Sequence, residues 1–400
     1  MSSFGDTLKR DGIETDASTD RRSETAEPSK DAPSIDRATL KQWLSDGAEL
    51  ALLDMRDAPA YGKGGPFFAP NIPLARLAAE AALVIPVKST RTVLVDDGDG
   101  VAESAWRILQ GFGYADLRIL SGGIAAWTAD GVEDLPPFGV SGAVFSEAVR
   151  AAKSTPFVTA AELGRLYAKG ADAIVLDTRT AEEFAIGHVP RALSVPGTEL
   201  LRRFADVVPS KETLVLVSCA GLPRAIIGAQ TLIDAQIPNR VAVLDNGTKG
   251  WREAGYEIEA GAGGGSAAIS AAAISFAARH VELLIAGSDL PRIDFATLTA
   301  WRTDQRRTSI FLDVRTPEEF AAGPIPHSTS ATGGQLFAGV YRRIAVRGAR
   351  VVLIDDLAGV RAKTTAYWLR QLDVDVTLFL YDFGAGADDP IVERGALERL

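Results

Sequence analysis

The chain has 400 residues, of which 46% are hydrophobic and 24% charged, a composition typical of a globular protein with about two to four domains. Its 42 basic and 52 acidic residues give a net charge of −10, which argues against a nucleic-acid or anionic-membrane partner. The single cysteine, Cys219, excludes an internal disulfide and a multi-cysteine zinc site, and the three histidines are too scattered to bind a metal. We therefore expect no metal and no cofactor.

The N-terminal segment and the most apolar stretch bear on localisation. Residues 1–33 are polar and mixed in charge, which predicts a disordered tail rather than a signal peptide. Residues 266–286 come nearest to a membrane span, but Arg279, His280 and Glu282 interrupt them, so they predict an alanine-rich helix. The sequence thus predicts a cytoplasmic protein.

Taken in chain order, the predicted elements repeat three times. In each repeat a helical pattern precedes a short strand that ends in Leu-Asp-x-Arg, and the three copies are Leu53–Arg56, Leu176–Arg179 and Leu312–Arg315. A second apolar strand follows and ends at a loop. We assign Asp97, Cys219 and Asp356 to corresponding positions in the three loops. They stand 43, 42 and 43 residues after the aspartate of the Leu-Asp-x-Arg segment in their repeat. This shared spacing indicates an internal repeat.

Short apolar strands that alternate with helices predict an α/β fold. We expect three tandem domains, each a small parallel sheet flanked by helices on both faces. The predicted organisation is a tail at 1–33, a domain at 34–135, a linker near 135–155, a domain with the cysteine at 155–260, a Gly/Ala-rich linker and helix at 261–290, and a domain at 291–395. Trp127 and Trp251, which close the first two repeats, are expected in the core.

Cys219 stands between a predicted strand, Leu214–Ser218, and a predicted helix that begins at Ala225. The free N–H groups and positive end of such a helix lower the pKa of a thiol and hold an anion. The alternative is a buried cysteine with only a packing role. The strand-loop-helix position, with Arg224 at the end of the loop, favours a nucleophile. This interpretation requires a thiol that is ionised and reachable.

Several motifs together resemble the rhodanese family. They are Asp-x-Arg after the first strand, Gly187–Ala192, the loop Cys219–Arg224, and Asn246-Gly247 with Trp251. The resemblance runs from about residue 34 to 390 and is strongest in the middle repeat, where Cys-Ala-Gly and the later Ile226–Gln230 are similar to multidomain rhodanese-related sulfurtransferases. It implies a small parallel-sheet α/β fold and transfer of sulfane sulfur through a cysteine persulfide.

The resemblance implies that Cys219 attacks a small anionic donor such as thiosulfate and passes the sulfur to a thiol, to cyanide or to a protein acceptor. Arg224 would act with it as a fixed cation. Loop N–H groups would bind the substrate, and the residues expected to do so are Ala220, Gly221, Leu222 and Ala225. Because Pro223 lacks an N–H and Leu222 is apolar, we expect weak activity on thiosulfate, or a less charged or protein-borne donor.

The other two loops lack a thiol. The first carries carboxylates that would repel an anionic donor, and in the third we expect Asp356 to pair with Arg361 as a structural lock. Counterparts of Asp177 and Arg179 occur in all three repeats, so these two residues are expected to be structural, and His188 to be a hydrogen-bonded residue in a turn. The outer repeats are then scaffolds that shield or present the middle site.

Two other functions stay open. One is a non-catalytic binding or regulatory protein, because two of the three repeats lack the thiol. The other is a phosphatase or arsenate reductase, which also sets cysteine and arginine around a helix N-terminus. Those loops place five residues between cysteine and arginine, whereas four stand between Cys219 and Arg224, which favours sulfur transfer.

Overall fold

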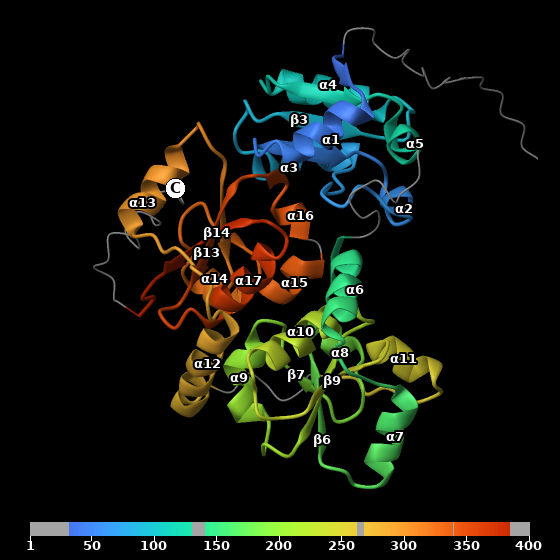
Figure 1. Ribbon diagram of the computed structural model, residues 1–400, viewed down its shortest axis with the longest axis vertical. Helices are drawn as coiled ribbons and strands as arrows, with labels where there is room; N and C mark the ends of the chain where they lie inside the picture. Colours follow the sequence, from blue (N-terminus) through green and yellow to red (C-terminus); the bar gives the residue numbers. More distant parts are fainter. Residues whose placement is uncertain (1–31, 130–140, 262–267, 339, 385–400) are drawn as a thin grey trace, which may run out of the picture.

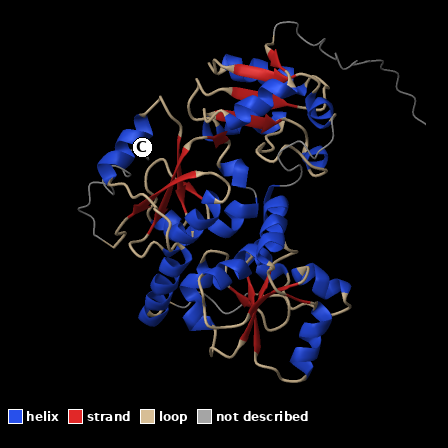
Figure 2. Cartoon of the chain, viewed as in Figure 1, coloured by secondary structure: helices blue, strands red, loops and turns tan. Residues whose placement is uncertain are grey.

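The computed structural model describes residues 32–129, 141–261, 268–338 and 340–384. Three sheets organise these residues (Figure 1), and helices lie on both faces of the strands (Figure 2). The α/β class and the parallel sheets flanked by helices are as the sequence predicts. We call the parts around the three sheets the first, middle and third units. The predicted tail and the end of the last predicted domain, residues 385–395, fall outside the described residues, apart from residues 32 and 33 of the tail.

The first unit is built on a sheet of order β1-β4-β3-β2-β12. Its own elements are β1 (Ser34–Ile35), α1 (Arg37–Ser45), β2 (Leu50–Asp54), α2 (Ala58–Tyr61), α3 (Leu74–Val84), β3 (Thr92–Val95), α4 (Val101–Gly111), β4 (Leu117–Leu120) and α5 (Gly123–Thr128). The strands β2 and β3 are buried along their whole length, because helices cover both faces. Trp127 is fully buried, as expected of a core residue.

The middle unit has the sheet order β5-β9-β8-β6-β7. Its elements are α6 (Ser141–Lys153), β5 (Phe157–Val158), α7 (Ala160–Ala168), β6 (Ala173–Asp177), α8 (Ala181–Ile186), β7 (Leu193–Ser194), α9 (Glu199–Val207), β8 (Leu214–Ser218), α10 (Pro223–Asp234), β9 (Val241–Leu244) and α11 (Gly247–Glu253). All its strand pairs are parallel. The stretch expected as a linker near 135–155 contains α6, which packs on α10 and contributes the buried residues Phe145 and Val149 to the core.

The third unit follows the helix α12 (Ala271–Leu284) and has the sheet order β11-β10-β13-β14. Its elements are α13 (Phe295–Thr303), β10 (Ser309–Asp313), α14 (Pro317–Ala322), β11 (Thr329–Ser330), α15 (Gly333–Ala338), α16 (Val340–Arg343), β12 (Val346–Arg347), β13 (Arg350–Asp355), α17 (Val360–Arg370) and β14 (Asp375–Leu380). The expected alanine-rich helix is present as α12 and packs against α9 and α17.

The third unit contacts both of the others. Its strand β12 is not part of the third sheet but pairs antiparallel with β2 at the edge of the first sheet, where Val346 lies opposite Ala51. On its other side, α15 packs against α10 of the middle unit. The close approach there depends on glycine, because a Cβ added at Gly197 would lie 2.5 Å from the Cα of Gly334. The three units therefore form one connected assembly rather than a string of separate parts (Figure 1).

We predict that Gly197→Ala destabilises the contact between the middle and third units. The added methyl group meets backbone, which has no rotamer with which to move aside, so α15 must shift. Overpacking of this kind costs about 1–3 kcal/mol. Hydrogen exchange of the α15 amides should accelerate, and chemical denaturation should report the loss in stability. Gly111→Ala, at the open end of α4, serves as the control and should not destabilise the protein, because alanine fits there and favours a helix; equal stability of both variants would contradict the prediction.

Candidate active site

Cys219 lies in the turn where the carboxyl end of β8 meets the amino end of α10. The backbone N–H groups of Gly221 and Ala225 are placed to interact with its Sγ atom and lower the pKa of the thiol. The side chain is only 1% exposed. The turn thus aims two amides at the sulfur, but it also closes around it, whereas the sequence interpretation requires a reachable thiol.

The start of α11, which follows β9, fixes the orientation of the peptides in the Cys219 loop. The N–H of Thr248 donates to the carbonyl of Cys219 at 2.9 Å, and that of Lys249 to the carbonyl of Ala220 at 3.2 Å. Gly247, at φ +51°, permits this approach, because a Cβ there would lie 2.1 Å from the Cys219 carbonyl oxygen. With those carbonyls held on the outside of the turn, amides of the same loop are left to face inward.

The lack of an N–H at Pro223, from which the sequence predicts a weakened loop, matters little at its position in the structure. It is the first residue of α10, a position whose N–H has no partner within a helix, and its ring fixes the backbone torsion that a helix needs. Leu222 is the N-cap, and its carbonyl accepts the N–H of Ile226 at 3.0 Å. The missing donor at Pro223 therefore costs the loop little, since the amides that reach Sγ come from Gly221 and Ala225.

Burial raises the pKa of the Cys219 thiol above its ordinary value. The amides of Gly221 and Ala225 and the charge of Arg224 lower that pKa, but they do not outweigh desolvation, and the charge of Asp177 raises it further. The expectation of a lowered pKa is therefore wrong for this closed state. The reason is that burial in the enclosed turn disfavours the charged thiolate more than the helix end and the amides favour it.

Arg224 is not a free cation. Its two terminal nitrogens, Nη1 and Nη2, donate to Oε2 and Oε1 of Glu183 at 2.6 and 2.8 Å, a bidentate pair. Glu183 is the third residue of α8, where it forms a capping box with Thr180. The guanidinium of Arg224 holds the pKa of this carboxyl at about 2. The pairing corrects the expectation of a cation reserved for the donor.

Strand register corrects which aspartates correspond to Cys219. The first-strand aspartates Asp54, Asp177 and Asp313 lie opposite Val95, Ser218 and Ile354 on the second strands. The residues that follow those partners are Asp96, Cys219 and Asp355. The thiol position is therefore filled by Asp96 and Asp355, not by Asp97 and Asp356, and the sequence count is wrong by one residue.

The carboxylates make the same contacts as the thiol. Asp96 accepts the N–H of Gly98 and of Ala102, both at 2.9 Å, two and six residues further on, as Gly221 and Ala225 are from Cys219. Its carbonyl accepts the N–H of Ile124 at 2.8 Å, the counterpart of the Thr248 contact. The turn is therefore an anion cradle, and in the first unit its own carboxylate fills it.

The third-unit cradle is filled by Asp355, which accepts the N–H of Ala362 at 3.0 Å and pairs with Arg361. Arg361 is fully buried and lies among several carboxylates, which are Asp355, Asp356, Glu199 and Glu319. Its pair with Asp356, at 3.0 Å, is the lock that the sequence predicts. Burial raises the pKa of Asp355. Because Glu199 belongs to the middle unit, this cluster also joins the two units.

The remaining residues that the sequence singled out are structural. Asp177 accepts the backbone N–H and the guanidinium of Arg179, which also donates to the carbonyl of Gly187 at 2.7 Å. The pairs Asp54–Arg56 and Asp313–Arg315 repeat this arrangement. His188 is buried, stacks on Phe184 and hydrogen-bonds to its carbonyl. In the described part of the chain, no group of three His, Cys, Asp or Glu side chains could hold a metal ion, and no helix is long and apolar enough to cross a membrane.

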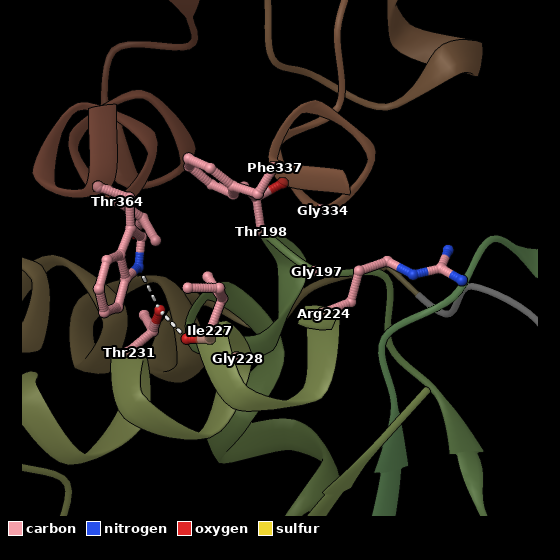
Figure 3. A pocket seen from close by; sticks show the side chains of 10 residues that line it. Gly197, Thr198, Arg224, Ile227, Gly228, Thr231, Gly334, Phe337 and Thr364 are labelled. Atoms are coloured by element: carbon pink, nitrogen blue, oxygen red, sulfur yellow. Dashed lines mark hydrogen bonds between the residues drawn. The ribbon is translucent and has the colours of Figure 1, made fainter. Parts of the chain in front are cut away.

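A small cavity lies beside this site, between the middle and third units (Figure 3). It has room for about one water molecule, with a volume of about 20 Å³. Its lining residues are Gly197, Thr198, Arg224, Ile227, Gly228, Thr231, Gly334, Phe337, Thr364 and Trp368. The guanidinium of Arg224 extends away from it in Figure 3. The cavity is therefore too small to receive a sulfur donor.

With the fold and the cysteine loop described, comparison with known proteins defines the class. A family model described as "Rhodanese-like domain" matches residues 36–130 and 159–254. The crystal structure of thiosulfate sulfurtransferase from Pseudomonas aeruginosa is 37% identical, covers 90% of this chain and 67% of that one, and has a TM-score of 0.82. The chain belongs to the rhodanese family.

Two curated relatives match over shorter lengths. The 3-mercaptopyruvate sulfurtransferase of Escherichia coli (strain K12) is 28% identical over 189 residues, which cover 40% of this chain and 64% of the relative. The HTH-type transcriptional regulator Rv0324 of Mycobacterium tuberculosis is 31% identical over 105 residues, 26% of this chain and 45% of the relative. The matches thus span less than two thirds of each of these relatives.

We predict that alkylation of Cys219 is slow at neutral pH and that its rate still rises through pH 9. The thiolate is the reactive species, and a raised pKa leaves little of it at neutral pH, with the fraction growing as the pH increases. The rate of iodoacetamide labelling, followed by mass spectrometry from pH 6 to 10, measures this. A rate that levels off below pH 7 would show instead that the amides and Arg224 dominate.

We predict that Asp96→Ala destabilises the protein by about 1–3 kcal/mol, because the amide of the buried Ala102 loses its acceptor. Asp97→Ala should change stability by less than about 0.5 kcal/mol, since the Asp97 side chain is half exposed and reaches Arg56 only at 3.5 Å. Urea denaturation of the two variants measures both. An equal loss of stability in the two variants would contradict the assignment of Asp96 to the position of the thiol.

Proposed function

We propose that the chain is a sulfurtransferase that moves sulfane sulfur from a donor to a thiophilic acceptor through a persulfide on Cys219. The observation that carries the proposal is the cradle: the turn that holds Cys219 holds a carboxylate in each of the other units. A turn built to accommodate an anion suits both a thiolate and the persulfide that would form on it. The sulfurtransferases among the relatives support the same reaction class.

In the proposed first half-reaction the Cys219 sulfur attacks the outer sulfur of the donor. With thiosulfate a new S–S bond forms to Cys219 as the donor S–S bond breaks. The electron pair of that bond leaves with sulfite, which also takes the thiol proton and departs as hydrogen sulfite. The amides of Gly221 and Ala225 then hold the negative persulfide. In the second half-reaction cyanide or a thiol takes the terminal sulfur, and the Cys219 thiolate that leaves takes up a proton from water to restore the thiol.

Burial of the thiol sets a condition on this reaction. Because Cys219 is 1% exposed, a donor can reach it only after the loop or the units around it open. The loop residues beyond the cysteine, from Ala220 to Arg224, are partly or fully exposed, so this loop is accessible to solvent. Opening of a few loop residues is therefore the step that we propose precedes attack.

We further propose that the three units are tandem rhodanese-like domains, with the boundaries given by the sequence, and that the first and third are catalytically silent. Their carboxylates occupy the cradle permanently and cannot carry a sulfane sulfur. We also propose that the donor is a small molecule and that Cys219 and Arg224 are the catalytic residues that pass its sulfur to the acceptor. A lone thiol that must stay reduced fits a cytoplasmic location.

We predict that incubation with a sulfane donor adds the mass of one sulfur atom at Cys219, and that cyanide removes it as thiocyanate. Cys219→Ser should abolish both events while leaving the fold intact, because serine fits the same turn. Intact-protein mass spectrometry with thiosulfate, 3-mercaptopyruvate and polysulfide measures the first event, and a colorimetric thiocyanate assay the second. Absence of an adduct with all three donors would leave the non-catalytic binding role, whereas Cys219-dependent phosphate release from an ester would favour a phosphatase.

A further inference from the structure

Two ion pairs contain the charged side chains that shift the pKa of the Cys219 thiol. Arg224 lowers this pKa and Asp177 raises it. Each is already paired, Arg224 with Glu183 at 2.6 Å and Asp177 with Arg179 at 2.8 Å. The charged side chains of these two pairs therefore balance one another, so the loop amides are the groups that favour an anionic donor.

The carboxylate that balances Arg224 has a partner from the third unit. Nε2 of Gln335, on α15, donates to Oε2 of Glu183 at 3.1 Å. The close contact between Gly197 and Gly334 sets the position of α15 against the middle unit. The N–H of Thr180 donates to the same Oε2 atom at 3.2 Å. Glu183 is thus held by its own helix, by Arg224 and by another unit, which fixes its carboxylate against the guanidinium.

Building on the proposed sulfurtransferase function, we propose that Glu183, held by Gln335, is a positioning residue that neutralises Arg224 and thereby selects donors with at most one negative charge. A lone guanidinium in a partly buried loop would attract a dianion such as thiosulfate strongly. With Glu183 beside it, the second charge of that dianion meets repulsion instead. A donor with one carboxylate, such as 3-mercaptopyruvate, or an organic persulfide escapes most of this penalty.

The test compares thiosulfate with 3-mercaptopyruvate in steady-state sulfur transfer to cyanide by the full chain. For Glu183→Gln we expect the ratio of kcat/KM for thiosulfate to that for 3-mercaptopyruvate to rise about tenfold, mainly through a lower KM for thiosulfate. Glutamine keeps an oxygen for the N–H of Thr180, so the helix cap survives. An unchanged or lower ratio overturns the proposal, and an equal fall in kcat for both donors would make Glu183 merely structural.

Matched variants separate the contributions. Glu182→Gln changes the net charge by the same amount on the neighbouring, exposed residue, and the ratio should stay as in the wild type; a rise there would overturn the role of the Arg224 contact. Gln335→Leu, on the exposed end of the contact, should move the ratio in the same direction as Glu183→Gln but less, and no movement would remove the third unit from the proposal.

Failure of the inference is distinguishable from failure of the proposed function. If wild-type chain takes up no sulfur from either donor, as judged by its mass, the sulfurtransferase proposal itself fails. If the wild type is loaded by both donors and the Glu183→Gln ratio does not rise, the reaction stands and only the role of Glu183 is lost.

Discussion

The site depends on one backbone constraint, which is the direction of the peptides in the turn between β8 and α10. Thr248 and Lys249 donate to the carbonyls of Cys219 and Ala220, so these carbonyls are committed to the outside of the turn. Amides of Gly221 and Ala225 are thereby left for the side chain inside it. The position-specific need for Gly247 follows, because any Cβ there would strike the Cys219 carbonyl oxygen. A turn of this form binds a negative group whichever side chain supplies it.

The three units occupy the same turn with different chemistry. In the first, both oxygens of Asp96 are used by amides, which satisfies the turn and leaves nothing for a ligand. In the third, Asp355 adds an ion pair to Arg361. The sulfur of Cys219 faces the corresponding amides, and in the proposed reaction it would accept and release a second sulfur. The three turns thus hold, within one chain, a carboxylate in two units and a thiol in the third.

The sequence predicts the fold class and the structural Asp-x-Arg pairs, because these depend on local pattern. It fails by one residue at the loops, since Asp96-Asp97 and Asp355-Asp356 are adjacent aspartates and only the strand register tells them apart. It also misses α6, although Phe145 and Val149 stand at helical spacing. The capping box on α8 is readable from Thr180 and Glu183, but the pairing of Glu183 with Arg224, 41 residues away, requires the folded sheet.

Packing between units explains why an arginine persists in a loop without a nucleophile. Arg361 bonds to Glu199 at 3.2 Å, and Glu199 begins α9 of the middle unit, so the third loop holds an element beside the middle site. In return, Gln335 of the third unit reaches Glu183. Each unit therefore supplies a side chain to the arginine-carboxylate pair of the other. Since removing one partner of a buried pair leaves an uncompensated charge, loss of Arg361 would weaken the contact between the middle and third units.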